Sequence, residues 1–225
     1  MGTAEIANNQ IIIVSHIITY GTAADSTITE LIRDEIETMW NEPQANLFLN
    51  DTTVSVRFLI TGSFQPNLVE QDILENTDPR NNYFRIEEFA LDNISFVDES
   101  EFNSGSNTGY FLLKNLSKGS TTAAHEYGHT LGLDHPDVLD LRGKGVPGIM
   151  YPRGTLVDPQ FQYDPGKPAG QPGGTMNPVH RRVLQQDIEN LALAHLSFTN
   201  STGILGDFTS IWHPNHAEIG PGELP

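Results

Sequence analysis

The segment TTAAHEYGHTLGLDH, residues 121–135, carries three histidines and one glutamate at spacings that suit a metal ion. Each residue of an α-helix turns by about 100°, so His125 and His129 lie on the same face one turn apart. Gly132 is expected to end this helix, because a residue without Cβ adopts the left-handed conformation easily. The chain then turns back and presents His135 as a third ligand. Three neutral imidazoles with one open coordination position are typical of a catalytic Zn²⁺ site.

Glu126 follows the first histidine and is rotated from it by about 100°, so it cannot complete the same row of ligands. Its carboxylate can instead face a water molecule on the metal. It would take the proton of that water during attack on a peptide carbonyl and pass it to the leaving amine. Zinc lowers the pKa of its bound water toward about 7, which makes hydroxide available at neutral pH. The segment therefore predicts a zinc-dependent endopeptidase with one catalytic Zn²⁺.

The string HEYGHTLGLDH matches the HExxHxxGxxH motif of the metzincin metalloproteases. Together with GIMYP at 148–152, it resembles the matrixins in particular. The resemblance implies that Met150, 15 residues after His135, is the Met-turn methionine beneath the three histidines, with Met176 as the weaker candidate. It also implies that an extended substrate pairs with the edge of a strand containing Gly109, Tyr110, Phe111 and Leu112. The alternative for that strand is a place in the sheet interior.

Several features depart from the matrixin pattern. Pro136 after the third histidine resembles the serralysins, but the glycine- and aspartate-rich calcium repeats of that family are absent. Residues 98–118 contain no histidine for a second zinc, and the chain has no cysteine for a matrixin-type latency segment. Tyr151 directly follows Met150, so we do not assign it to the metal. The sequence thus indicates a matrixin-like metzincin outside the standard subfamilies.

Composition excludes several other classes of function. The chain has 225 residues, with 29 Asp+Glu against 12 Lys+Arg and a formal net charge of −17, which disfavours nucleic acid and anionic membrane surfaces. The one basic pair, Arg181-Arg182, is too small to reverse this. No apolar run reaches the ~18 residues of a membrane span. The acidic run DESE at 98–101 offers oxygen ligands for Ca²⁺, but we favour a solvated charge run.

The elements expected around the motif form a single α+β domain over residues 1–198, with residues 199–225 as a C-terminal tail that packs on or extends from it. This metzincin-type domain is expected to contain a twisted, mostly parallel sheet, the active-site helix and a C-terminal helix. The start of the chain looks disordered. The other expected elements are strands at 11–20, 53–62, within 82–97 and at 109–115; helices from Ser26, at 120–131 and at 178–196; a helical turn at 68–74; and an irregular segment at 136–178.

Two alternatives to a general endopeptidase remain. One is a non-catalytic zinc-containing module that binds peptides, and Glu126 argues against it because such a module needs no base. The other is a toxin or effector peptidase with a single target protein. We expect a secreted, monomeric protein, although the apolar run from Ile11 to Ile18 does not resemble a signal peptide because no basic residue precedes it.

Overall fold

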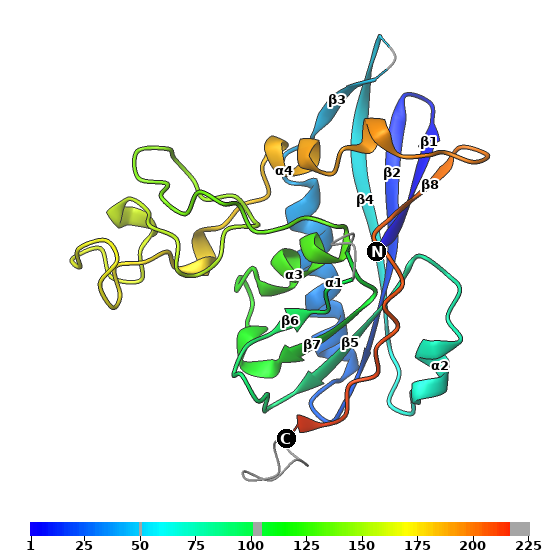
Figure 1. Cartoon of the computed structure of the whole chain (residues 1–225), viewed down its shortest axis with the longest axis horizontal. Coiled ribbons are helices and arrows are strands. Elements are labelled where there is room, and N and C mark those ends of the chain that lie inside the picture. Colours follow the sequence, from blue (N-terminus) through cyan, green and yellow to red (C-terminus); the bar gives the residue numbers. More distant parts are fainter. Residues whose placement is uncertain (50, 101–104, 217–225) are drawn as a thin grey trace.

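The computed structural model describes residues 1–49, 51–100 and 105–216, and Figure 1 shows the arrangement of the elements. The helices are α1 (Ser26–Asn41), α2 (Glu70–Leu74), α3 (Thr122–Thr130) and α4 (Gln185–Asn190). The strands are β1 (Gly2–Ala7), β2 (Gln10–Tyr20), β3 (Asn46–Leu49), β4 (Thr52–Phe64), β5 (Asn81–Glu87), β6 (Phe96–Val97), β7 (Thr108–Leu112) and β8 (Thr202–Leu205). The α+β fold class predicted from the sequence is confirmed, in one domain.

The strands of the described chain form one mixed sheet in the order β3-β4-β2-β5-β7-β6. The pairs β2–β4, β2–β5 and β5–β7 are parallel, whereas β3–β4 and β6–β7 are antiparallel. The long strand β2 pairs along almost its whole length with β4. On its other side the first half pairs with β1 and the second half with β5, and β1 in turn pairs with β8. The strand expected to be the substrate-binding edge, β7, therefore lies inside the sheet.

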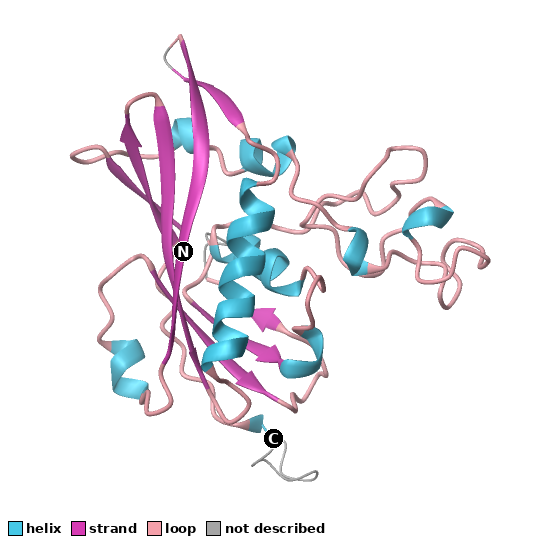
Figure 2. Ribbon diagram, turned by 180° about the vertical axis from the view of Figure 1, so that it is seen from behind, coloured by secondary structure: helices cyan, strands magenta, loops and turns pink. Residues whose placement is uncertain are grey.

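Helices α1 and α3 cover one face of the sheet (Figure 2). Alternate residues of β2, including Ile11, Ile13 and Ile17, are fully buried against that layer. Asp25 caps α1, since its side chain accepts a hydrogen bond of 2.7 Å from the N–H of Ile28. The helix therefore begins at Ser26, as expected from the sequence. The indole Nε1 of Trp40, near the end of α1, donates to the carbonyl of Ala124 in α3 at 3.0 Å and so joins the two helices.

The opposite face of the sheet is covered by residues 207–216, which we call the C-terminal strap. Trp212 stacks on Tyr20 with ring centroids 5.1 Å apart, and His216 stacks on Tyr110 at 4.1 Å. The Nε2 atom of His213 lies 2.9 Å from Oδ2 of Asp98, the residue directly after β6. The strap therefore fixes the position of the edge strand β6 from behind.

The disordered start predicted from the sequence is wrong, because residues 2–7 form β1 between β2 and β8. The predicted helix over residues 178–196 is also wrong. Its span holds a 3₁₀ turn at Pro178–His180, the short helix α4 and a second 3₁₀ turn at Leu193–His195. The N–H of Arg182 donates to the carbonyl of Pro147 at 3.0 Å, and this bridge pulls the chain out of helical geometry. Ala192 interrupts it again with φ of +51°.

The Gly/Pro-rich segment 136–178 projects from the body of the molecule and is irregular, as predicted (Figure 1). Its own small core of Leu141, Val157 and Met176 holds it in shape. Backbone hydrogen bonds, such as that of 2.8 Å from Leu141 N–H to the carbonyl of Leu156, close its loops. Among the described residues, no helix has both the length and the apolar character that a membrane span requires.

Candidate metal centre

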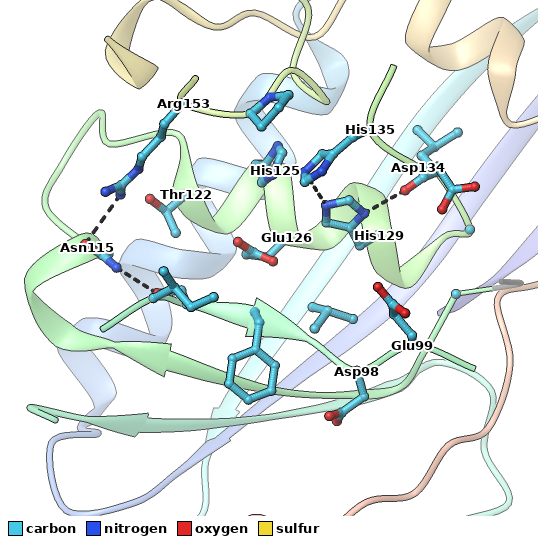
Figure 3. A pocket seen from close by; sticks show the side chains of 18 of the residues that line it. Asp98, Glu99, Asn115, Thr122, His125, Glu126, His129, Asp134, His135 and Arg153 are labelled. Carbon is cyan, nitrogen blue, oxygen red and sulfur yellow. Dashed lines mark hydrogen bonds between the residues drawn. The ribbon is translucent and has the colours of Figure 1, made fainter. Parts of the chain in front are cut away.

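The three histidines of the motif converge on one point (Figure 3). The Nε2 atom of His135 lies 3.1 Å from Nε2 of His125 and 3.2 Å from Nε2 of His129. A tetrahedral ion at ~2.0–2.1 Å from each nitrogen would hold its ligands about 3.3–3.4 Å apart, so the observed spacing is close to that of a zinc site. Within the described part of the chain, no second group of three His, Cys, Asp or Glu side chains converges in this way.

The hydrogen bonds of the rings select the form that binds a metal. Nδ1 of His125 donates to the carbonyl of Ile149 and Nδ1 of His129 to the carbonyl of Leu133, each at 2.7 Å. Because a carbonyl only accepts, both Nδ1 atoms carry the hydrogen and both Nε2 atoms present a lone pair to the centre. Lone pairs that face one another without a shared proton repel, whereas a cation between them satisfies all of them. The donor set therefore fits a divalent metal ion.

Burial keeps these rings neutral. It lowers the pKa of His125 well below its ordinary value, and the positive charge of Arg181 acts in the same direction. Burial, followed by the neighbouring His135, lowers the pKa of His129 to about 4. The pKa of His135 is lowered as well, again chiefly by burial and then by Arg181. At neutral pH all three imidazoles are thus available as ligands.

Local backbone structure sets the two ends of α3. Before the helix, Thr121 has φ of +63°, and the side chain of Glu35 from α1 accepts hydrogen bonds from the N–H groups of Ala123 and Ala124 at 2.9 and 3.4 Å. After the helix, Gly132 has φ of +94°, a conformation that costs a glycine little. The turn at Gly132 brings His135 back over the helix.

Glu126 lies in the same pocket, beside the histidines and opposite strand β6 (Figure 3). Burial raises the pKa of its carboxyl group to about 8. The positive charges of Arg181 and Arg153 and a hydrogen bond from the N–H of Val97 oppose that shift. The carboxyl group is therefore close to the cleft, shielded from bulk water and able to exchange a proton near neutral pH.

Met150 is buried beneath α3, next to the motif. A Cβ atom built on Gly128 would lie 2.3 Å from its sulfur, so the methionine is packed against the bare backbone of the helix. Met176 lies elsewhere, in the core of the irregular segment, and Tyr151 packs partly buried against that same cluster. Of the two methionines, Met150 is the one that the structure brings to the histidines.

The pocket has a volume of about 440 Å³ and three walls. One wall is α3 with its motif, and a second is β6 with the residues around it. The third wall comes from Pro152 and Arg153 of the irregular segment and from Arg181. Neither β6 nor the two arginines were predicted from the sequence as parts of the site. The only signal for Arg181 in the sequence is a basic pair in a strongly acidic chain.

The four residues predicted to bind substrate, Gly109, Tyr110, Phe111 and Leu112, lie one strand away from the pocket edge. The strand β7 pairs with β5 along its whole length and with β6 at Gly109 and Tyr110. Tyr110 and Leu112 point to the face covered by a separate cluster with Ala90, and Phe111 points into the main core. The expectation of a free edge is wrong at Gly109 and Tyr110, because the short antiparallel β6 pairs with them, and the N–H of Leu112 donates to the side chain of Ser95 at 3.0 Å.

The acidic run at 98–101 is described only in part, since Glu101 lies outside the described residues. Oδ2 of Asp98 lies within hydrogen-bonding distance of His213 and accepts a hydrogen bond of 2.5 Å from the hydroxyl of Thr108. This carboxylate therefore has partners from the protein, and Glu99 is exposed at the rim of the pocket.

No protein-family model and no curated protein matches the chain. Among solved structures, archaemetzincin from Methanopyrus kandleri superposes with a TM-score of 0.39 and 11% identity, covering 80% of this chain and 94% of that one. Myroilysin superposes with a TM-score of 0.29 and 15% identity, covering 65% of this chain and 60% of that one. Both likenesses are distant.

Proposed function

We propose that this protein is a zinc-dependent endopeptidase of the metzincin type. The observation that carries the proposal is the convergence of three imidazole Nε2 atoms in one pocket with a buried glutamate beside them. His125, His129 and His135 would hold the ion through these atoms. A zinc ion bound there would supply Lewis-acid polarisation of a carbonyl and a bound water of lowered pKa.

Glu126 is proposed as the general base. Its carboxylate would accept the proton of the attacking water and return it to the nitrogen of the leaving amine. The low exposure of the side chain, 7%, favours this role because proton transfer then occurs away from competing solvent. The N–H of Val97 contacts the same carboxyl group, so β6 and Glu126 approach each other across the pocket.

The substrate is proposed to be a protein or peptide that lies extended along β6. One edge of Phe96–Val97 pairs with β7, and its surroundings line the pocket on the other side. A strand with one unpaired edge can take up an extended peptide by main-chain hydrogen bonds. This position replaces Gly109–Leu112 as the proposed contact with the substrate backbone.

The finer assignment within the metzincins is also a proposal. Met150 is proposed as the Met-turn methionine, supported by its packing against Gly128 directly below the histidines. The matrixin-like grouping rests on the motif and on the GIMYP segment. Secretion is proposed because a strongly acidic chain, with a formal net charge of −17, suits an extracellular setting rich in cations. A dedicated toxin with one target is the alternative biology for the same chemistry.

The experiment measures zinc per chain and then cleavage of casein with and without a chelator. The variant Glu126→Gln should keep the zinc and lose cleavage by about 10²–10⁴-fold. Glu88→Gln, a change of the same type at an exposed position outside the pocket, should behave like the parent. A Glu126→Gln variant as active as the parent contradicts the assigned base. A parent that binds zinc and peptides but cleaves none would support the non-catalytic module instead.

A further inference from the structure

Arg181 is a buried cation that the proposed reaction does not use. Only 3% of the residue is exposed, yet its side chain lines the pocket of the candidate metal centre. Its buried Nε atom has no hydrogen-bond partner among the described residues. Buried arginines are normally paired, because an uncompensated charge in the interior is costly. The charge of Glu126 in the same pocket acts on this guanidinium, but no carboxylate of the described residues makes an ion pair or hydrogen bond with it.

The backbone holds Arg181 firmly at this place. Its N–H donates to the carbonyl of Pro178 at 2.9 Å, and the same carbonyl accepts a hydrogen bond of 2.8 Å from the hydroxyl of Thr121 at the start of α3. On the other side, the bridge between Arg182 and Gly148 fixes the following residue to the segment that leads to Met150. Arg181 is thus anchored both to the helix that carries the histidines and to the segment beneath it.

A second arginine lines the same pocket. Arg153 is exposed, and its Nη2 lies 3.5 Å from Oδ1 of Asn115, its one hydrogen bond in the described structure. Burial chiefly lowers the pKa of Arg181, to about 10, and the charge of Arg153 acts in the same direction, whereas Glu126 opposes the shift. Two of the 12 basic residues of an acidic chain therefore share one pocket, and neither forms an ion pair with a carboxylate of the described residues.

The charges of the pocket are separated along its length. Figure 3 shows Arg153 at one end, with Asp98, Glu99 and Asp134 at the other. Glu99 and Asp134 are exposed, so they present negative charge at their end. A ligand that crosses the pocket would meet positive charge on one side of the histidines and negative charge on the other.

We propose that Arg181 and Arg153 form a carboxylate-binding subsite beside the metal centre. This inference rests on the proposed peptidase function and names its substrate class: peptides with a carboxylate close to the cleaved bond. The planar fork of a guanidinium matches a carboxylate with two parallel hydrogen bonds, and binding would give the unpartnered Nε–H of Arg181 an acceptor. The carboxylate comes from an Asp or Glu side chain or from the carboxy terminus of the substrate.

Matched peptides test this proposal on the zinc-loaded enzyme. Cleavage sites from a peptide library are rebuilt with Glu or Gln at each position flanking the cleaved bond, and with a free or amidated carboxy terminus. The enzyme should cleave one carboxylate form about 10- to 100-fold faster, measured as kcat/KM. A preference for Glu over Gln identifies a side-chain carboxylate, and a preference for the free acid over the amide identifies the terminus.

Variants then assign the preference to Arg181. Arg181→Met should reduce the ratio of the two kcat/KM values to near 1, and Arg181→Lys should leave an intermediate ratio because it keeps the charge without the fork. Arg57→Met is the matched control, since this exposed arginine of β4 lies outside the pocket. It should retain the ratio of the parent. Equal cleavage of both forms by the parent would overturn the subsite and leave the peptidase function intact.

A second measurement is independent of activity. The Nε–H nuclear magnetic resonance of Arg181, identified by its loss in Arg181→Lys, should shift on addition of succinate to the zinc-loaded protein and not on addition of succinamide. This measurement shows whether the subsite binds a carboxylate even if the protein cleaves no peptide. Absence of cleavage would contradict only the proposed peptidase function. A resonance that responds equally to both compounds, or to neither, would overturn the subsite.

Discussion

Helix α3 and the irregular segment 136–178 both contribute walls to the same pocket, but they are built in opposite ways. The helix places His125 and His129 through its own periodicity, with backbone hydrogen bonds that any helix makes. The irregular segment has almost no regular structure and is held by a small core of its own. It still supplies the carbonyl of Ile149, which fixes the ring of His125, and Met150, which supports the helix from below.

This difference suggests that α3 determines the chemistry of the site and that the irregular segment determines its selectivity. Positions within one helix are fixed by local geometry, so the two metal ligands in α3 tolerate little variation. The third wall depends on long-range contacts, such as the bridge between Gly148 and Arg182, and its side chains can vary with less effect on the fold. We expect changes in the helix wall to remove metal or activity, and changes in the third wall to alter which substrates are cleaved.

Removal of a metal ligand gives the largest expected effect. His135 lies outside α3, so His135→Ala tests whether the turn after the helix matters as much as the helix itself. Loss of a residue that only hydrogen-bonds to a metal ligand weakens metal binding by about 10- to 100-fold. Loss of the ligand itself should have a larger effect, so the variant should bind zinc more than about 100-fold more weakly. Zinc titration monitors the effect, with His195→Ala, an exposed histidine outside the pocket, as the control. Equal zinc affinity in both variants would contradict the site.

The second largest expected effect concerns the contact between Gly128 of α3 and Met150 of the irregular segment. Gly128→Ala places a methyl group 2.3 Å from the sulfur of Met150, and overpacking of this kind costs about 1–3 kcal/mol. A gain of about 1 kcal/mol in helix propensity offsets part of it. Because 2.3 Å is far below an ordinary contact distance, the cost should lie near the upper end of its range, and urea denaturation should show a free energy of unfolding lower by about 2 kcal/mol.

Gly154→Ala is the control for that contact, because a Cβ atom at Gly154 meets nothing within 4 Å. It should leave the free energy of unfolding almost unchanged. If Gly128→Ala is as stable as this control, Met150 is not packed against the helix as described.

The wall formed by β6 depends on the C-terminal strap. His213→Ala removes the contact of 2.9 Å with Asp98 and should lower the free energy of unfolding by about 1 kcal/mol. If β6 holds the substrate, KM should rise more than kcat falls. Ile211→Ala, at an exposed position of the same strap, is the control. A change in kcat alone would argue against a role of β6 in substrate binding.

The smallest effect concerns the pH dependence of stability at the start of α3. Burial raises the pKa of Glu35 above its ordinary value of 4.5, although the N–H groups of Ala124 and Ala123 oppose the shift. A raised pKa means that the fold favours the protonated form, so the contribution of Glu35 to stability is full below about pH 4.5 and decreases as pH rises through the pKa of the folded state. Glu35→Gln does not titrate.

Urea denaturation of both proteins across this pH range isolates the effect. The free energy of unfolding of the parent, taken relative to that of Glu35→Gln, should fall as pH rises. A difference that stays constant or increases with pH would show that Glu35 is not buried as the structure describes.

The sequence predicted the helix wall well because its signals are local. The spacing of the histidines, the glycine that follows them and the apolar periodicity of α1 all act over a few residues. In the third wall, the position of Arg181 was not predicted. The expected helix over 178–196 would have continued past Arg181, whereas the bridge from Arg182 to Pro147 breaks it and turns Arg181 into the pocket. Nothing within ten residues of Arg181 encodes that bridge.

The edge strand was misplaced for a similar reason. The apolar run at 109–112 marks β7 as a strand, but it cannot show whether both edges are paired. The partner β6 has only two residues, Phe96 and Val97, which is too short for any periodic pattern. Its position depends on β7 and on the contact between His213 and Asp98, 115 positions apart in the chain. Such contacts become visible only in the folded structure.

The most direct test of the central claim is the coordination shell of zinc in the purified, zinc-loaded protein, measured by X-ray absorption. One ion per chain with three imidazole nitrogens at ~2.0–2.1 Å and a further oxygen is the expected result. A protein that stays zinc-free when offered the metal, or a shell with fewer than three imidazoles, would contradict it.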